Sequence, residues 1–214
     1  MVTKHNELCA FLDPDAGLLT ELVNTGVFTT FDVMRVRGIT GLGEICKVIL
    51  DILVRKSESA FPLFMDALRA SGQGHVSYIL TGQGESPLSR VRRLVLNKAR
   101  KDLVRTVNIT CSSLMSELIS TGVFDDADKQ RIKAEKTDED KVGVLIDLMV
   151  RKSDLAYDKY LQALKDSGHR QVAEALEGLE LMANVVLHFR GDTSETNRDR
   201  IIIAVRDRMK DAFV

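Results

Sequence analysis

The hexapeptide ILVRKS at residues 52–57 is repeated almost unchanged as LMVRKS at residues 148–153. When the chain is aligned with itself at a shift of 96 residues, the similarity extends well beyond both ends of this hexapeptide. Over residues 18–80, roughly 22 of 63 aligned pairs are identical, and no gap is needed. A period of this length is too long for a solenoid repeat and matches a whole small domain. The sequence therefore predicts a duplicated domain.

The composition favours a helical protein with a packed core. Of the 214 residues, 44% are hydrophobic and 29% are charged, tryptophan is absent, and there are only three prolines. The net charge of −1 gives no overall reason to expect a nucleic-acid partner. We find no apolar run of about 18 residues and no signal-peptide pattern, so neither a membrane span nor a leader is predicted. Cys9, Cys46 and Cys111 lack motif spacing, which favours free thiols and a cytoplasmic protein.

Apolar residues recur at helical spacing in both copies. One stripe comprises Ile45, Val48, Ile49, Ile52 and Leu53, matched in the second copy by Val144, Leu145, Leu148 and Met149. A second stripe comprises Ala60, Phe61, Phe64, Ala67 and Leu68, matched by Ala156, Tyr157, Tyr160, Ala163 and Leu164. No segment alternates between apolar and polar residues as a strand would. We therefore expect the all-α class.

Glycines and capping residues divide each copy into about six short helices. In the first copy, helices are expected near residues 3–12, 14–25, 30–37, 43–56, 57–71 and 73–81. The second copy repeats this pattern with a longer first helix, residues 87–107. We assign residues 1–84 and 85–180 to two domains. Residues 181–214 form a C-terminal tail that contains an expected amphipathic helix at residues 200–213.

Three motifs occur once in each copy. They are L-x-x-x-G-V-F at residues 22–28 and 118–124, the Arg-Lys helix end at 55–56 and 151–152, and A-F/Y…A-L-R/K-x-S-G-Q/H at 60–73 and 156–169. With these motifs, each copy resembles a caspase recruitment domain (CARD) of the death-fold superfamily. The death-effector subfamily is the nearest rival, but its expected charged triad is not found. The resemblance implies two consecutive six-helix bundles over about residues 5–81 and 87–177.

The resemblance also implies a non-enzymatic function, as an adaptor or an N-terminal recruitment module in apoptotic or innate-immune signalling. The expected partners are other CARD-containing proteins, such as a caspase precursor, a receptor or an adaptor. No catalytic residue, cofactor or metal is predicted. The glycines before Lys47 lack phosphate-loop spacing, the four histidines lack metal-ligand spacing, and no nucleophile–base signature occurs.

Members of this family bind one another through a basic surface on helices 1 and 4 and an acidic surface on helices 2 and 3. The basic candidates here are Lys47, Arg55 and Lys56, then Arg92, Arg93, Lys98, Arg100, Arg151 and Lys152. The acidic candidates are Asp13, Asp15, Glu21 and Asp32, then Glu117, Asp125, Asp126 and Asp128. The two Arg-Lys pairs could instead only stabilise helix C-termini through the macrodipole.

The charge is unevenly distributed along the chain. Residues 1–85 carry a net charge of −3, whereas residues 86–109 alone carry +6. An apolar seam runs through this basic segment at Leu88, Val91, Val95, Ala99, Leu103 and Val107. The segment could be a solvated face, a docking surface or an anion site, although base stacking is disfavoured because no aromatic residue is near.

Opposite charged faces on one domain predict head-to-tail self-association into filament-like assemblies. Two alternatives stay open from the sequence. One is an inhibitory decoy that blocks the assembly of such domains. The other is a helical module that binds an anion, either nucleic acid or acidic lipid, through residues 90–105.

Overall fold

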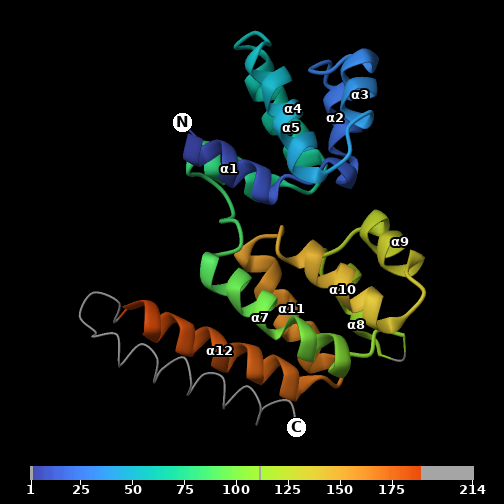
Figure 1. The fold of residues 1–214 in the computed structure, drawn as a ribbon, viewed down its shortest axis with the longest axis vertical. Helices are drawn as coiled ribbons and strands as arrows, with labels where there is room; N and C mark the ends of the chain where they lie inside the picture. Colours follow the sequence, from blue (N-terminus) through green and yellow to red (C-terminus); the bar gives the residue numbers. More distant parts are fainter. Residues whose placement is uncertain (1, 111, 189–214) are drawn as a thin grey trace. The chain divides into compact units, whose positions relative to one another are not determined.

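The computed structural model describes residues 2–110 and 112–188, and it is built from helices and connecting turns (Figure 1). Within these ranges there is no β-strand, only one isolated bridge between Pro87 and Ser153, so the predicted all-α class is confirmed. None of the helices described is long and apolar enough to cross a membrane. The chain divides into two compact units. The first comprises residues up to Pro87 with the turn Arg151–Asp154, and the second comprises Leu88–Val150 and the residues from Leu155 onward.

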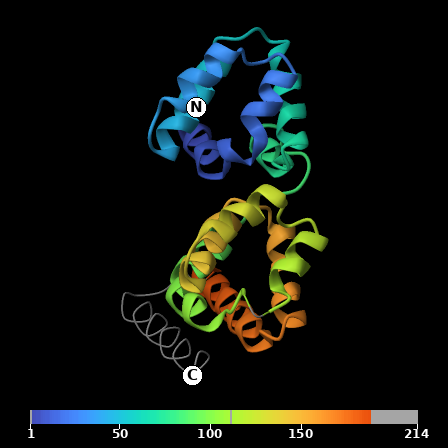
Figure 2. The ribbon, with the colours of Figure 1, turned by 90° about the vertical axis from the view of Figure 1, so that its right-hand side faces the viewer.

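The first unit is a small helical bundle (Figure 2). Its elements are α1 (Val2–Phe11), the π-helical turn η1 (Pro14–Leu18), α2 (Leu19–Asn24), α3 (Thr30–Arg37), α4 (Leu42–Val54), α5 (Ala60–Ala70) and α6 (Gly74–Thr81). The helix expected over residues 14–25 is therefore a π-helical turn that continues into a shorter α-helix. Asp13 caps this turn because its carboxylate accepts a hydrogen bond from the backbone N–H of Asp15 at 3.0 Å.

The core of the first unit contains most of the residues that the periodicity predicts. The side chains of Leu18, Leu22, Phe28, Ile49, Ile52, Phe64 and Leu68 are buried. Val48 is only half-buried. Phe61 is 49% exposed, so its prediction as a core residue is wrong. The aligned Tyr157 of the second unit is fully buried, and the guanidinium of Arg92 lies 4.8 Å from the centre of its ring. Among the described residues, no cation–π contact involves Phe61.

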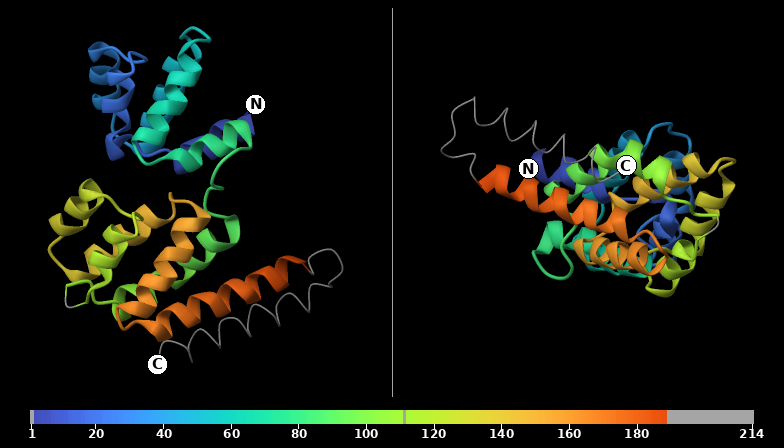
Figure 3. Two further views of the ribbon diagram at one scale, coloured as in Figure 1. Left: turned by 180° about the vertical axis from the view of Figure 1, so that it is seen from behind. Right: turned by 90° about the horizontal axis from the view of Figure 1, so that it is seen from below.

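The second unit contains six α-helices within the described residues. They are α7 (Arg90–Thr106), α8 (Leu114–Ser120), α9 (Asp126–Ala134), α10 (Asp138–Met149), α11 (Asp154–Asp166) and α12 (Arg170–His188). The long helix α7 packs against α10 and α12 (Figure 3). Its apolar seam is buried as predicted except at Val91, which is half-buried. Helix α12 continues past the predicted domain end at residue 180, whereas the expected helix at 200–213 lies outside the described residues.

Corresponding turns in the two units have the same local geometry. Gly26 and Gly122 follow α2 and α8 with left-handed φ angles of 74° and 70°, which only glycine adopts without strain. The hydroxyl of Thr25 donates to the carbonyl of Glu21 at 2.8 Å, and that of Thr121 donates to the carbonyl of Glu117 at 2.7 Å. At the 96-residue shift, Thr25 aligns with Thr121 and Glu21 aligns with Glu117, so both pairs are identical.

A second correspondence involves Gln73 and His169, which occupy equivalent positions before α6 and α12. The amide of Gln73 accepts a hydrogen bond from the backbone N–H of Asp13 and donates one to its carbonyl, both at 2.8 Å. The Nε2 atom of His169 accepts a hydrogen bond from the backbone N–H of Asn108 at 3.3 Å. In each unit, this side chain holds the loop that follows the first helix.

Candidate protein-interaction surfaces

Arg92, a predicted partner-binding residue, makes its contacts within the second unit. Its guanidinium donates to Glu180 of α12 and to Asp158 of α11, both at 2.7 Å, and stacks on Tyr157. Only 17% of its side chain is exposed. These contacts join α7 to two other helices, so Arg92 has a structural role.

Arg100 is also paired internally. Its Nη2 donates to Asp147 Oδ2 at 2.8 Å and to the carbonyl of Gly143 at 3.2 Å, both on α10. Hydrogen bonding to Asp147 raises the pKa of the Arg100 guanidinium. A Cβ added at Gly143 would lie only 3.4 Å from Nη2 of Arg100, so the glycine allows the arginine to pass close to α10. Arg93 is half-buried.

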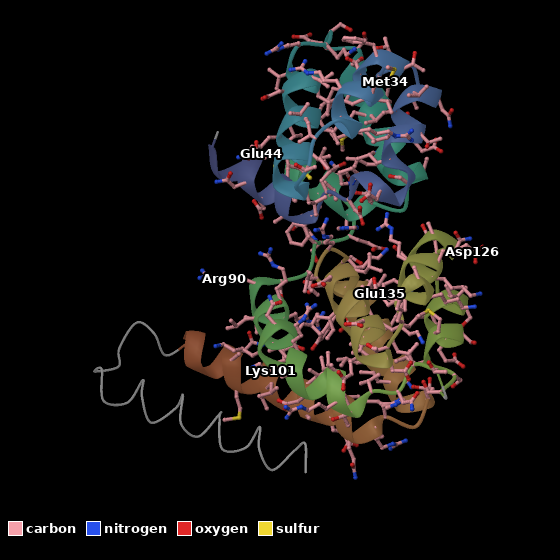
Figure 4. All side chains as sticks on the ribbon, turned by 45° about the vertical axis from the view of Figure 1, so that its right-hand side comes forward. Met34, Glu44, Arg90, Lys101, Asp126 and Glu135 are labelled. Carbon is pink, nitrogen blue, oxygen red and sulfur yellow. The ribbon has the colours of Figure 1, made fainter. Side chains whose placement is uncertain are left out.

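The face of α7 opposite its apolar seam carries a group of exposed cations, with Leu94 at its centre. We call this group the basic stripe. Its members are Arg90, Lys98, Lys101 and Arg105. With Leu94, which is 49% exposed, they recur at i, i+4, i+8, i+11 and i+15 and so share one helical face. No ion pair recorded for the described residues involves these four cations. Figure 4 labels Arg90 and Lys101 on α7.

The sequence prediction named only Lys98 of this stripe as a partner-binding residue. The other three lie within the basic segment 90–105, and their position opposite the seam Leu88–Val95–Ala99–Leu103 could have identified them. On a helical projection, the cations of the basic stripe lie on the face opposite the seam, whereas Arg92 and Arg100 lie beside the seam.

In the first unit, Lys56 belongs to a local network. Its Nζ lies 2.9 Å from Asp32 Oδ2 and 5.9 Å from the centre of the Phe28 ring. Asp32 also accepts a hydrogen bond from the backbone N–H of Thr29 at 2.9 Å and completes a capping box at the start of α3. The hydrogen bond from Thr29 and the ammonium of Lys56 lower the pKa of Asp32. Lys56 and Asp32 therefore stabilise the start of α3, so reversing Arg55 and Lys56 together would also alter the stability of the first unit.

The remaining basic candidates differ in exposure. Arg55 is exposed, and among the described residues no ion pair includes it. Lys47 pairs with Glu44 at 2.6 Å on the surface, where such pairs contribute little to stability. Arg151 and Lys152 lie in the turn between α10 and α11 and are half-buried.

Two acidic candidates are buried and do not reach the surface. Asp13 is 8% exposed and caps η1. The side chain of Asp128 is 1% exposed and lies 3.9 Å from Arg131. Asp125 is exposed and caps α9 by accepting from the backbone N–H of Asp128 at 2.8 Å. Asp15 and Asp126 are exposed, whereas Glu21 and Glu117 are half-buried.

No group of three or more His, Cys, Asp or Glu side chains that could hold a metal ion occurs in the part of the chain that is described. Cys46 is buried against the carbonyl of Leu12, and this burial raises its pKa to about 12. A thiol with such a pKa is not a nucleophile at neutral pH.

Residues 93–179 match the family model of the caspase recruitment domain, from the first turn of α7 into α12. This match agrees with the resemblance of the second copy and supports a protein-interaction domain in this segment. No curated protein and no solved structure matches the chain. For residues 5–81, the resemblance stays a prediction.

Proposed function

We propose that the chain is a protein-interaction module made of two consecutive CARD-type domains, residues 5–81 and 87–177. For the second domain, the family match over residues 93–179 supports this. For the first, the support is the similarity of residues 18–80 to residues 114–176, with roughly 22 identities in 63 pairs. The shared turn geometry at Gly26 and Gly122 agrees with a common fold.

The partner of the second domain binds to the basic stripe on α7. The observation that carries this proposal is that Arg90, Lys98, Lys101 and Arg105 are exposed on one face, while Arg92 and Arg100 are paired with carboxylates inside the unit. A surface of unpaired cations favours a partner with an acidic surface, and it accelerates association through electrostatic steering.

Leu94 favours a protein partner over a nucleic acid or a lipid headgroup. It is 49% exposed at the centre of the stripe, where it offers an apolar contact between the cations. Interfaces between proteins combine an apolar centre with a polar rim. Helix α7 has no aromatic residue on which a base could stack.

The acidic partner is another CARD, in a caspase precursor, a receptor or an adaptor of apoptotic or innate-immune signalling. Of the basic candidates in the first domain, Arg55 is exposed and takes part in no ion pair among the described residues, so it is available for the same purpose. The exposed carboxylates of Asp15, Asp125 and Asp126 lie on other helices than the stripe. Contacts between such different patches are heterologous and can continue into rings or filaments.

The test compares Lys98→Glu/Lys101→Glu with the matched control Lys133→Glu/Lys136→Glu, which makes the same charge change at exposed positions outside α7. Binding to purified recruitment domains with acidic surfaces is measured for the full chain. We expect the stripe variant to bind at least about tenfold more weakly, a loss of about 1.4 kcal/mol, and the control to bind like the parent. Equal weakening in both variants, or parent binding only to RNA or acidic vesicles, would contradict the proposal.

A further inference from the structure

The outer face of α3 in the first unit exposes two large apolar side chains. Phe31 is 73% exposed and Met34 is 69% exposed. They are three residues apart and therefore adjacent on the helix surface. Figure 4 labels Met34 on α3. Exposed aromatic and methionine side chains that lie side by side are typical of protein-interaction sites.

Val54 is a further exposed apolar residue at this end of the first unit. It is the last residue of α4 and is 85% exposed. The ion pair between Lys56 and Asp32 fastens the turn after α4 to the first turn of α3. Val54 and Phe31 each lie within two residues of this pair, so they are at the same end of the unit.

Three exposed arginines border the apolar side chains: Arg35 and Arg37 on α3, and Arg55 beside Val54. None of them takes part in an ion pair recorded for the described residues. Asp32, the one acid in the sequence of α3, is held by Lys56 and Thr29. We call Phe31, Met34, Val54 and these three arginines the α3 patch.

The second unit shows that the fold does not require this patch. At the 96-residue shift, Ala127 and Gln130 of α9 occupy the positions of Phe31 and Met34, and both are exposed. Val150, aligned with Val54, is half-buried. Packing within the first unit does not explain why Phe31 and Met34 are large and apolar.

We propose that the α3 patch binds an acidic amphipathic helix of another protein. The apolar face of that helix lies against Phe31 and Met34, because an amphipathic helix presents apolar residues at i, i+3 and i+4. Its carboxylates accept hydrogen bonds from Arg35 and Arg37, whose planar guanidinium groups suit a carboxylate better than lysine does. This surface lies in a different domain from the basic stripe, so either proposal can be correct without the other.

The probe is a synthetic helical peptide of about 18 residues, about five turns, with leucine on one face and glutamate on the other. The control peptide has lysine at every glutamate position. Both are titrated into the isotope-labelled full chain, and backbone amide shifts are recorded. We expect the glutamate peptide to shift the amide signals of residues 30–37 and 54–56, and the lysine peptide to leave them unchanged.

Two variants make the test specific. Phe31→Ala/Met34→Gln introduces the residues that α9 carries at these positions, so the thermal midpoint should stay near that of the parent. Its affinity for the glutamate peptide should fall at least about tenfold. Arg35→Glu/Arg37→Glu should reverse the preference, so that the lysine peptide binds more tightly than the glutamate peptide.

Three results would overturn the proposal. The first is a set of shifts confined to α7, which would place the acidic peptide on the basic stripe. The second is unchanged affinity in the Phe31→Ala/Met34→Gln variant. The third is self-association of the parent in sedimentation that this variant abolishes, since the occupant would then be a second copy of the chain.

Discussion

Replacing Tyr160 with phenylalanine should stabilise the second unit. Tyr160 is fully buried, and among the described residues its hydroxyl has no hydrogen-bond partner. Burial also raises the pKa of this hydroxyl, as expected for a group removed from water. The first unit has Phe64 at the aligned position, where it is 3% exposed. The same fold position therefore accepts the ring without its oxygen.

The size of the effect follows from two opposing contributions. A buried hydroxyl without a hydrogen bond costs about 1–3 kcal/mol. Removing its oxygen sacrifices a few dispersion contacts of about 0.1–0.2 kcal/mol each. The net gain in the free energy of unfolding should be about 1 kcal/mol. For a domain of this size, such a gain raises the thermal midpoint by about 4–8 °C.

The assay is hydrogen exchange of core amides in α11, combined with thermal unfolding of the full chain. The reciprocal control is Phe64→Tyr, which should destabilise the first unit by a similar amount because it buries an extra hydroxyl. If Tyr160→Phe lowers the free energy of unfolding by about 1 kcal/mol or more, the hydroxyl makes a stabilising hydrogen bond and the reasoning is refuted.

Further predictions concern folding and pH. Phe64→Ala should lower the free energy of unfolding, measured by urea denaturation, by about 3–5 kcal/mol. Phe61→Ala, at a half-exposed ring, should lower it by less than about 1 kcal/mol. Equal losses in the two variants would contradict the burial pattern. Lys56→Glu should lower the thermal midpoint because it replaces an ion pair with a repulsion, whereas Arg55→Glu should not; identical midpoints would refute the structural role of Lys56. Burial lowers the pKa of His169, so the unfolded chain binds more protons and stability should fall as the pH drops below about 6.5. His169→Gln, the residue of the first unit, should reduce this decline measured by urea denaturation, and an identical pH dependence would contradict it.

The helices could be predicted closely from the sequence because their ends are marked locally. Glycines such as Gly26 and Gly122 and the caps Thr29 and Thr137 fix boundaries through neighbouring backbone groups. The π-helical turn at Pro14–Leu18 was missed, since the apolar spacing there also fits an ordinary α-helix. Phe61 was misplaced for a different reason: its spacing relative to Phe64 is helical, but its burial depends on what other elements cover it.

The charged surface was harder to predict, because sequence gives residue types and not their partners. Arg92 pairs with a residue 88 positions away, and Arg100 pairs with one 47 positions away. These distant partners give Arg92 and Arg100 contacts within the second unit that the sequence alone does not reveal. The exposed cations that remain, Lys101 and Arg105 among them, could have been recognised by a helical projection that places them opposite the apolar seam of α7.

The most direct measurement of the central claim is the salt dependence of binding to one purified recruitment domain with an acidic surface. Calorimetric titrations compare the parent with Lys98→Glu/Lys101→Glu/Arg105→Glu at low and at physiological salt, where screening shortens to about 8 Å. If the basic stripe binds the partner, the parent should lose affinity steeply with salt, and the variant should bind weakly at both concentrations. If the variant keeps the parent's affinity and its salt dependence, the partner binds elsewhere and the account is contradicted.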